Sequence, residues 1–153
     1  NVISCSPDEV QLVMQAFQLL HSSSGIIGMD WNEVKWAISS GRNIEFLHGM
    51  ASGENCVALA CEQLIPKLKN LSSNYPIKNV MINMFADISF GCEQQDFIIQ
   101  QIDKNLVLND ATTFYQLSFF HEFDYWKKGE HVCCICMFLV YADKEDDIEP
   151  VII

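Results

Sequence analysis

Two carboxylates that could do chemistry, Asp30 and Glu33, stand three residues apart where a glycine-containing stretch gives way to a helical pattern. Asp at a helix cap and Glu at the third helical position form a reciprocal capping arrangement, so capping alone explains the pattern. Two carboxylates at one helix entrance could also orient a water molecule for attack on another group. The two interpretations are compatible, and the residues by themselves leave both open.

The cysteines are the second set of reactive side chains, and Cys133 and Cys136 form a C-x-x-C pair. Residues three apart on a strand point to opposite faces, and no second pair of ligands stands at zinc spacing. Cys134 and Cys136 share a face at about 6.5–7 Å, which is the limit of disulfide reach. The pattern therefore favours buried free thiols, which suit a reducing cytoplasm.

The histidines and glycines carry no local signature of a catalytic site. His21, His48, His121 and His131 fall in different predicted elements, so core or surface histidine is a better interpretation than a Cys–His nucleophile pair. The seven glycines are dispersed, with no G-x-x-x-x-G-K-[ST] and no glycine-rich loop between a strand and a helix. We therefore expect no cofactor in this chain and no independent binding of nucleotide phosphates.

Composition limits the partners. The 153 residues make one ordinary domain, half of them hydrophobic, with nine Lys and Arg against twenty Asp and Glu and a formal charge of −11. Such an acidic surface repels phosphate backbones and anionic lipid, so we expect no nucleic-acid partner. The longest apolar run has only strand length, so we expect no membrane insertion.

Periodicity predicts the elements that position these residues. Helical patterns occupy residues 8–21, 30–40, 54–71 and 90–105, and strand patterns occupy 43–50, 78–87, 112–123 and 131–142. Pro66 is expected to end or kink the third helix. A turn at 126–129 would join the last two strands, most simply as a hairpin. The order predicts an α/β (α+β) fold, a two-layer sandwich of helices on a mixed sheet of about four strands.

The first helix is apolar on two faces. One face carries Val10, Val13, Met14, Phe17 and Leu20, and the other carries Leu12, Ala16 and Leu19. A helix that is apolar on nearly all sides is normally buried on nearly all sides. We therefore predict that it lies between two bodies, of which this chain supplies one, and that part of it exposes apolar side chains here.

Two motifs resemble the C-terminal half of the tubulin/FtsZ superfamily. The first is G-I-I-G-M-D-W-N-E-V, residues 25–34, and the second is G-M-A-S-G-E-N, residues 49–55. The matching positions are Gly25, Asp30 and Val34 in the first motif and Gly49, Ala51, Ser52, Gly53 and Glu54 in the second. The order of elements agrees over residues 8–142. The chain differs at Gly28, where the family has Asn, and at Cys56, where the family usually has Arg.

The resemblance implies a domain organisation. Residues 1–24 would be the core helix between an N-terminal GTPase domain and the C-terminal domain, which accounts for its two apolar faces. Residues 25–142 would be the FtsZ/tubulin-like C-terminal domain itself. Residues 143–153 would be an acidic, solvated tail.

The resemblance also implies a function. Subunits of that family stack head to tail, and the loop acids of one subunit act on the GTP bound by the next. By this match Asp30 and Glu33 are catalytic, Gly28 lies at a position facing that GTP, and GTP and Mg²⁺ come with the N-terminal domain and a neighbouring subunit. The expected protein is a cytoplasmic, filament-forming GTPase of the cell-division cytoskeleton. The alternative is a non-catalytic FtsZ-like module that docks on filaments or on another protein.

Overall fold

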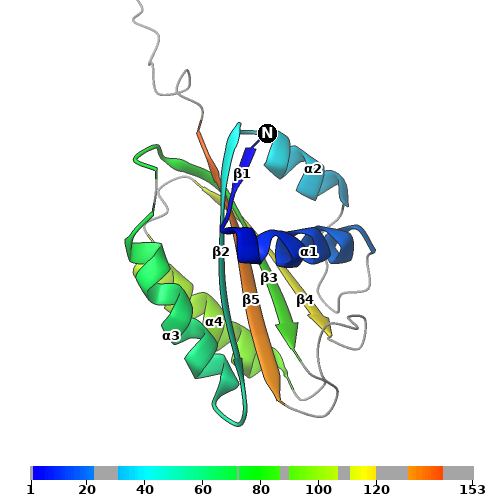
Figure 1. Cartoon of the computed structure of the whole chain (residues 1–153), viewed down its shortest axis with the longest axis vertical. Coiled ribbons are helices and arrows are strands. Elements are labelled where there is room, and N and C mark those ends of the chain that lie inside the picture. The colour runs from blue at the N-terminus through cyan, green and yellow to red at the C-terminus, as the bar shows by residue number, and fades with distance from the viewer. Residues whose placement is uncertain are drawn as a thin grey trace, which may run out of the picture.

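The structure is a computed structural model that describes residues 2–22, 31–71, 73–86, 90–106, 111–119 and 131–142. The described elements follow one another along the chain as shown in Figure 1. They are β1 (Val2–Ser4), a 3-10 turn η1 (Pro7–Glu9), α1 (Val10–Ser22), α2 (Trp31–Ser39), β2 (Asn43–Ser52), α3 (Cys56–Lys69), β3 (Ile77–Ala86), α4 (Cys92–Asn105), β4 (Thr112–Phe119) and β5 (Val132–Tyr141).

The strands form one mixed sheet in the order β1-β2-β5-β3-β4. β1 runs parallel to β2 and β3 runs parallel to β4, whereas β5 is antiparallel to both of its neighbours. The predicted α/β class with a mixed sheet is confirmed. The sheet has five strands rather than four because β1, three residues long, adds to the edge of β2.

The predicted hairpin between the last two strands is wrong, because β3 lies between β4 and β5. β5 is apolar at nearly every position, and Cys133–Val140 are all fully buried. A strand of that kind is covered on both faces and belongs in the middle of a sheet. β4 instead reaches the side of β3 through the crossover helix α4, as a parallel pair requires.

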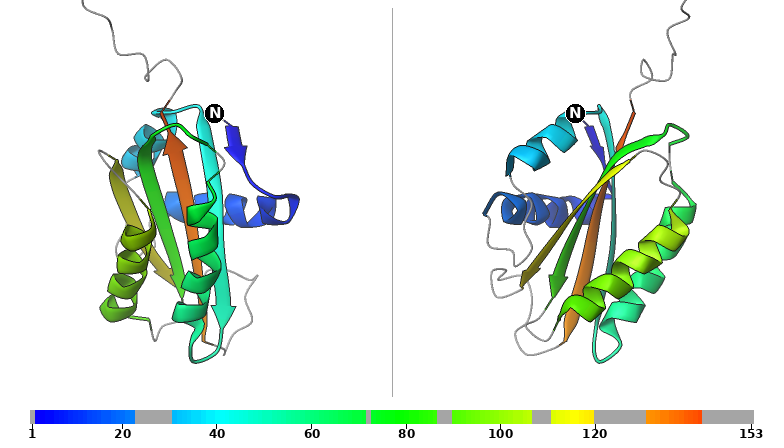
Figure 2. Two further views of the ribbon diagram at one scale, coloured as in Figure 1. Left: turned by 90° about the vertical axis from the view of Figure 1, so that its left-hand side faces the viewer. Right: turned by 180° about the vertical axis from the view of Figure 1, so that it is seen from behind.

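Helices cover both faces of the sheet, so the fold has three layers rather than the two expected. Figure 2 shows α3 and α4 on one face and α1 and α2 on the other. Each face has its own apolar cluster, one formed with α3 and α4 and one formed with α1 and α2. Since β3 and β5 present apolar side chains to both faces, a single helical layer would leave one face exposed to water.

Two local features of α3 explain how it packs. Pro66 does not end the helix, which continues to Lys69, because Pro66 lies on the exposed side close to the helix end. Opposite the helix, a Cβ at Gly49 would collide with the backbone carbonyl oxygen of Ala60. Glycine in β2 therefore allows the helix and strand backbones to approach closely.

Over residues 10–18, whose side chains the structure describes, the first helix is buried on one side and exposed on the other. Leu12, Val13 and Ala16 of α1 are buried, whereas Val10 is 48% exposed and Met14 is 68% exposed. The prediction that part of this helix exposes apolar side chains is confirmed. No helix within the described residues is long and apolar enough to cross a membrane.

Candidate functional site

Glu33 lies in the first turn of α2, and its side chain is exposed. Val34 and Ala37 of the same helix are fully buried against the sheet. This burial fixes the rotation of α2 and directs the opposite side of the helix, with Glu33 and the 57% exposed Trp36, away from the core. A carboxylate in this position is accessible to a second molecule.

The other two residues singled out from the sequence, Gly28 and Asp30, lie outside the described residues. The structure therefore positions one member of the acidic pair. The proposed roles of Gly28, Asp30 and Glu33 remain predictions.

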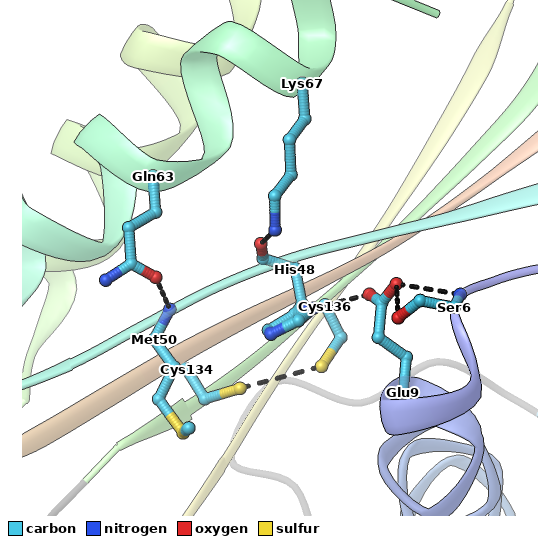
Figure 3. A network of polar contacts seen from close by, with 8 residues as sticks. All are labelled: Ser6, Glu9, His48, Met50, Gln63, Lys67, Cys134 and Cys136. Carbon is cyan, nitrogen blue, oxygen red and sulfur yellow. Dashed lines mark hydrogen bonds and ion pairs between the residues drawn. The ribbon is translucent and has the colours of Figure 1, made fainter. Parts of the chain in front are cut away.

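A polar network that the sequence did not indicate joins the N-terminal segment to the sheet. Figure 3 shows the Glu9 carboxylate of η1 between Ser6 and His48 of β2. Nδ1 of His48 lies 2.5 Å from Oε2 of Glu9 and must donate, because a carboxylate only accepts. Oε1 of Glu9 accepts from the Ser6 backbone N–H at 3.1 Å and from the Ser6 hydroxyl at 2.8 Å.

These hydrogen bonds decide the charge of Glu9. Partial burial alone would raise its pKa, but the hydrogen bonds from His48 and Ser6 outweigh burial and hold the pKa below its ordinary value of 4.5. Glu9 is therefore ionised near neutral pH. It forms an ion pair with His48 whenever the imidazole is protonated.

His48 also lies directly opposite Cys136 across the β2–β5 ladder. Glu9, His48 and Cys136 thus follow the order of an acid, a base and a thiol, as in a nucleophilic site. Cys136 is, however, completely buried, and burial followed by the neighbouring Cys134 raises its pKa well above the usual range. It stays a thiol, so the arrangement does not supply a nucleophile.

The predictions that Cys133 and Cys136 point to opposite faces and that the cysteines of β5 are buried are confirmed. Cys133 belongs to the cluster under α3 and α4, and Cys136 belongs to the cluster under α1 and α2, so the C-x-x-C pair is split between the two faces. Cys134 and Cys136 share a face with their sulfur atoms 3.7 Å apart, and both are free. Among the described residues no group of three or more His, Cys, Asp or Glu could hold a metal ion.

Two side chains of α3 bind the open edge of β2. The Gln63 side-chain oxygen accepts the Met50 backbone N–H at 3.0 Å, and the Lys67 ammonium donates to the His48 carbonyl oxygen at 2.6 Å (Figure 3). Backbone groups on a sheet edge otherwise remain available to another strand. These contacts occupy the Met50 N–H and the His48 carbonyl oxygen, beyond the part of the edge that β1 covers.

Two hollows lie away from Glu33. One, of about 560 Å³, lies where α3, α4 and β5 begin, with Glu54, Phe90, Glu93, Phe97 and His131 among its walls. The other, of about 570 Å³, includes Glu45 and Tyr141. The Tyr141 hydroxyl donates to Glu45 at 2.5 Å, and burial followed by that carboxylate raises the Tyr141 pKa.

No protein-family model matches the chain, and no curated protein sequence matches it. Among solved structures, this mixed three-layer α/β arrangement is that of the FtsZ/tubulin-like fold.

Two of the similar structures are FtsZ from M. jannaschii. One is the W319Y mutant, with 17% identity and a TM-score of 0.69, covering 93% of this chain and 40% of the FtsZ chain. The other is an empty FtsZ dimer, with 12% identity and a TM-score of 0.64, covering 83% of this chain and 35% of the FtsZ chain. The chain therefore has an FtsZ-like fold and spans well under half the length of those proteins.

Proposed function

We propose that this chain is the C-terminal GTPase-activating and polymerisation part of an FtsZ-like, filament-forming GTPase. Asp30 and Glu33 would act on the GTP bound by the adjacent subunit in a head-to-tail filament. The observation that carries the proposal is the accessible carboxylate at the start of α2, on a chain whose fold is similar to that of FtsZ.

The geometry of α2 suits this role. A helix fixed by Val34 and Ala37 holds its first turn rigidly, so a carboxylate there can be presented at a constant position to another subunit. Glu33 would orient the attacking water and accept its proton, while GTP and Mg²⁺ belong to the neighbouring subunit. The one-sided burial of α1, with Val10 and Met14 exposed, supports a preceding domain that covers this side.

The test compares GTP turnover by the longest polypeptide that the native gene encodes with turnover by its Glu33→Ala variant. We expect turnover to fall roughly a hundredfold, the lower end of what a general base contributes, while filaments still sediment. Glu62→Ala, which removes an exposed acid from α3 on the other face, is the matched control and should leave turnover unchanged. Equal turnover by Glu33→Ala and wild type in assembled filaments would remove the catalytic role.

A second candidate is a non-catalytic FtsZ-like module that binds filaments or another protein. Gly28 and Cys56 favour it, since they replace the Asn and Arg of the motifs, and Cys56 is buried at the start of α3 where it offers no charge. The sequence upstream of Asn1 discriminates the two. A reading frame with a G-G-G-T-G-[ST]-G loop supports the GTPase, and one without it supports the module.

A further inference from the structure

The N-terminal segment is attached to the sheet by a short strand pair and by apolar side chains of α1. β1 pairs with β2 over only three residues. Among the α1 side chains that the structure describes, Leu12, Val13 and Ala16 are buried, and the Phe17 ring packs on Phe138 with centroids 4.8 Å apart. Segments with few buried apolar contacts open locally at lower free energy than the whole protein unfolds.

Glu9 occupies the junction of this segment, between β1 and α1. Its carboxylate bridges Ser6 and His48 and so joins the N-terminal segment to β2 of the sheet. Residues 10–18 of α1 include no charged side chain, and Asp8, the neighbouring acid, is exposed. From the other elements, Cys134 and Cys136 face His48 from β5, and Lys67 of α3 binds its backbone oxygen.

Cysteine side chains lie beneath α1, and their accessibility can be used to detect its release from the sheet. Cys134 and Cys136 are completely buried on the face that α1 and α2 cover. Cys56, Cys61 and Cys133 are buried on the α3/α4 face, and burial raises the pKa of Cys61 to about 11. Each face of the sheet therefore has its own set of protected thiols.

We propose that residues 2–22 form an N-terminal strap that releases from the sheet as a unit, with the Glu9–His48 contact as its fastening. Release exposes the face that carries Cys134 and Cys136, while the α3/α4 face stays closed. The apolar face of the sheet beneath the strap would thus become accessible only when the Glu9–His48 contact breaks. This inference does not depend on the function proposed above.

The test is labelling of the native chain with N-ethylmaleimide at constant pH, with each cysteine followed by peptide mass spectrometry. Cys5 and Cys92, which are partly or fully exposed, react first. We expect Cys134 and Cys136 next, well before Cys61 and Cys133 of the α3/α4 face. Glu9→Ala and His48→Leu should each speed labelling of Cys134 and Cys136 roughly tenfold, because each removes a charge-assisted hydrogen bond.

The labelling of Cys61 and Cys133 separates strap release from loss of the fold, because both lie in the cluster under α3 and α4 and strap release leaves that face closed. Asp8→Ala is the matched control and should leave every rate unchanged. The double variant Glu9→Ala, His48→Leu should label Cys134 and Cys136 no faster than either single variant, since both break the same contact. Labelling of all the buried thiols at one rate would overturn the proposal. So would a double variant in which labelling is accelerated by the product of the two single-variant factors.

Discussion

At the residue scale, Glu9 shows how an apparently local acid becomes a tertiary contact. Its position three residues after Ser6 predicts a role at the helix start, and the hydrogen bonds to Ser6 confirm it. Its second oxygen binds His48, which is 39 residues away in sequence. No spacing rule connects residues that far apart, so this half of the site could not be predicted from the sequence.

The lowered pKa of Glu9 gives a pH dependence. Because the pKa is lower in the folded chain than in the unfolded chain, ionised Glu9 stabilises the fold above pH 4.5, and this stabilisation is lost as pH falls through the folded pKa. Urea unfolding should show wild type more stable than Glu9→Gln at neutral pH, with the difference vanishing in acid. In a His48→Gln background the same comparison should show a smaller difference.

Gly49 makes a second prediction at this scale. Gly49→Ala places a methyl group against the Ala60 carbonyl oxygen, so β2 and α3 must move apart. We expect the free energy of unfolding to fall by about 2 kcal/mol, in the range of overpacking substitutions. Ala58→Gly, in the exposed part of α3, is a useful comparison because it should lower stability by only about 1 kcal/mol through helix propensity. Equal effects of the two substitutions would contradict the close-packing explanation.

At the element scale, periodicity located the helices and strands but not their pairing. The spacing of the apolar residues predicts the runs that form β2, β3 and β5 and also predicts α1. The hairpin prediction is wrong because β4 and β5, although consecutive in sequence, are not neighbours in the sheet. The apolar residues at successive positions of β5 already indicated a central strand, which needs a neighbour on each side.

The one-sided packing of α1 predicts unequal effects along one helix. Leu12→Ala should lower the free energy of unfolding by about 2–3 kcal/mol, because it leaves a cavity between α1 and the sheet. Met14→Ala, with the side chain already 68% exposed, should change it by less than about 0.5 kcal/mol. Thermal or urea unfolding of the isolated chain measures both. A large effect of Met14→Ala would mean that this chain itself buries the outer side of α1.

At the scale of the whole molecule, the number of layers follows from how many strand faces are apolar. Both the odd and the even positions of β3 and β5 carry apolar residues. Both faces of the sheet must therefore be covered by helices. A single layer of helices would cover only one of these two faces. The acidic pair was found from the sequence, and the structure adds that Glu33 is accessible, which a helical pattern alone does not decide.

The net charge of −11 predicts a dependence on salt. Like charges on a compact surface repel one another more strongly than on the expanded unfolded chain, and salt screens that repulsion. The midpoint of urea unfolding at neutral pH should therefore rise between low and moderate sodium chloride. A parallel series in a non-ionic osmolyte at matched osmolality controls for solvent exclusion, and an equal rise there would contradict the electrostatic explanation.

The side chains of Gln63 and Lys67 have a consequence for how the protein behaves when concentrated. Amyloid-like growth needs an edge strand with unpaired backbone N–H and C=O groups, to which the backbone of another chain can hydrogen-bond. The Met50 N–H and the His48 carbonyl oxygen are already hydrogen-bonded to side chains of α3. An incoming strand must therefore displace the Gln63 amide and the Lys67 ammonium group before it can pair with β2 at these two backbone groups.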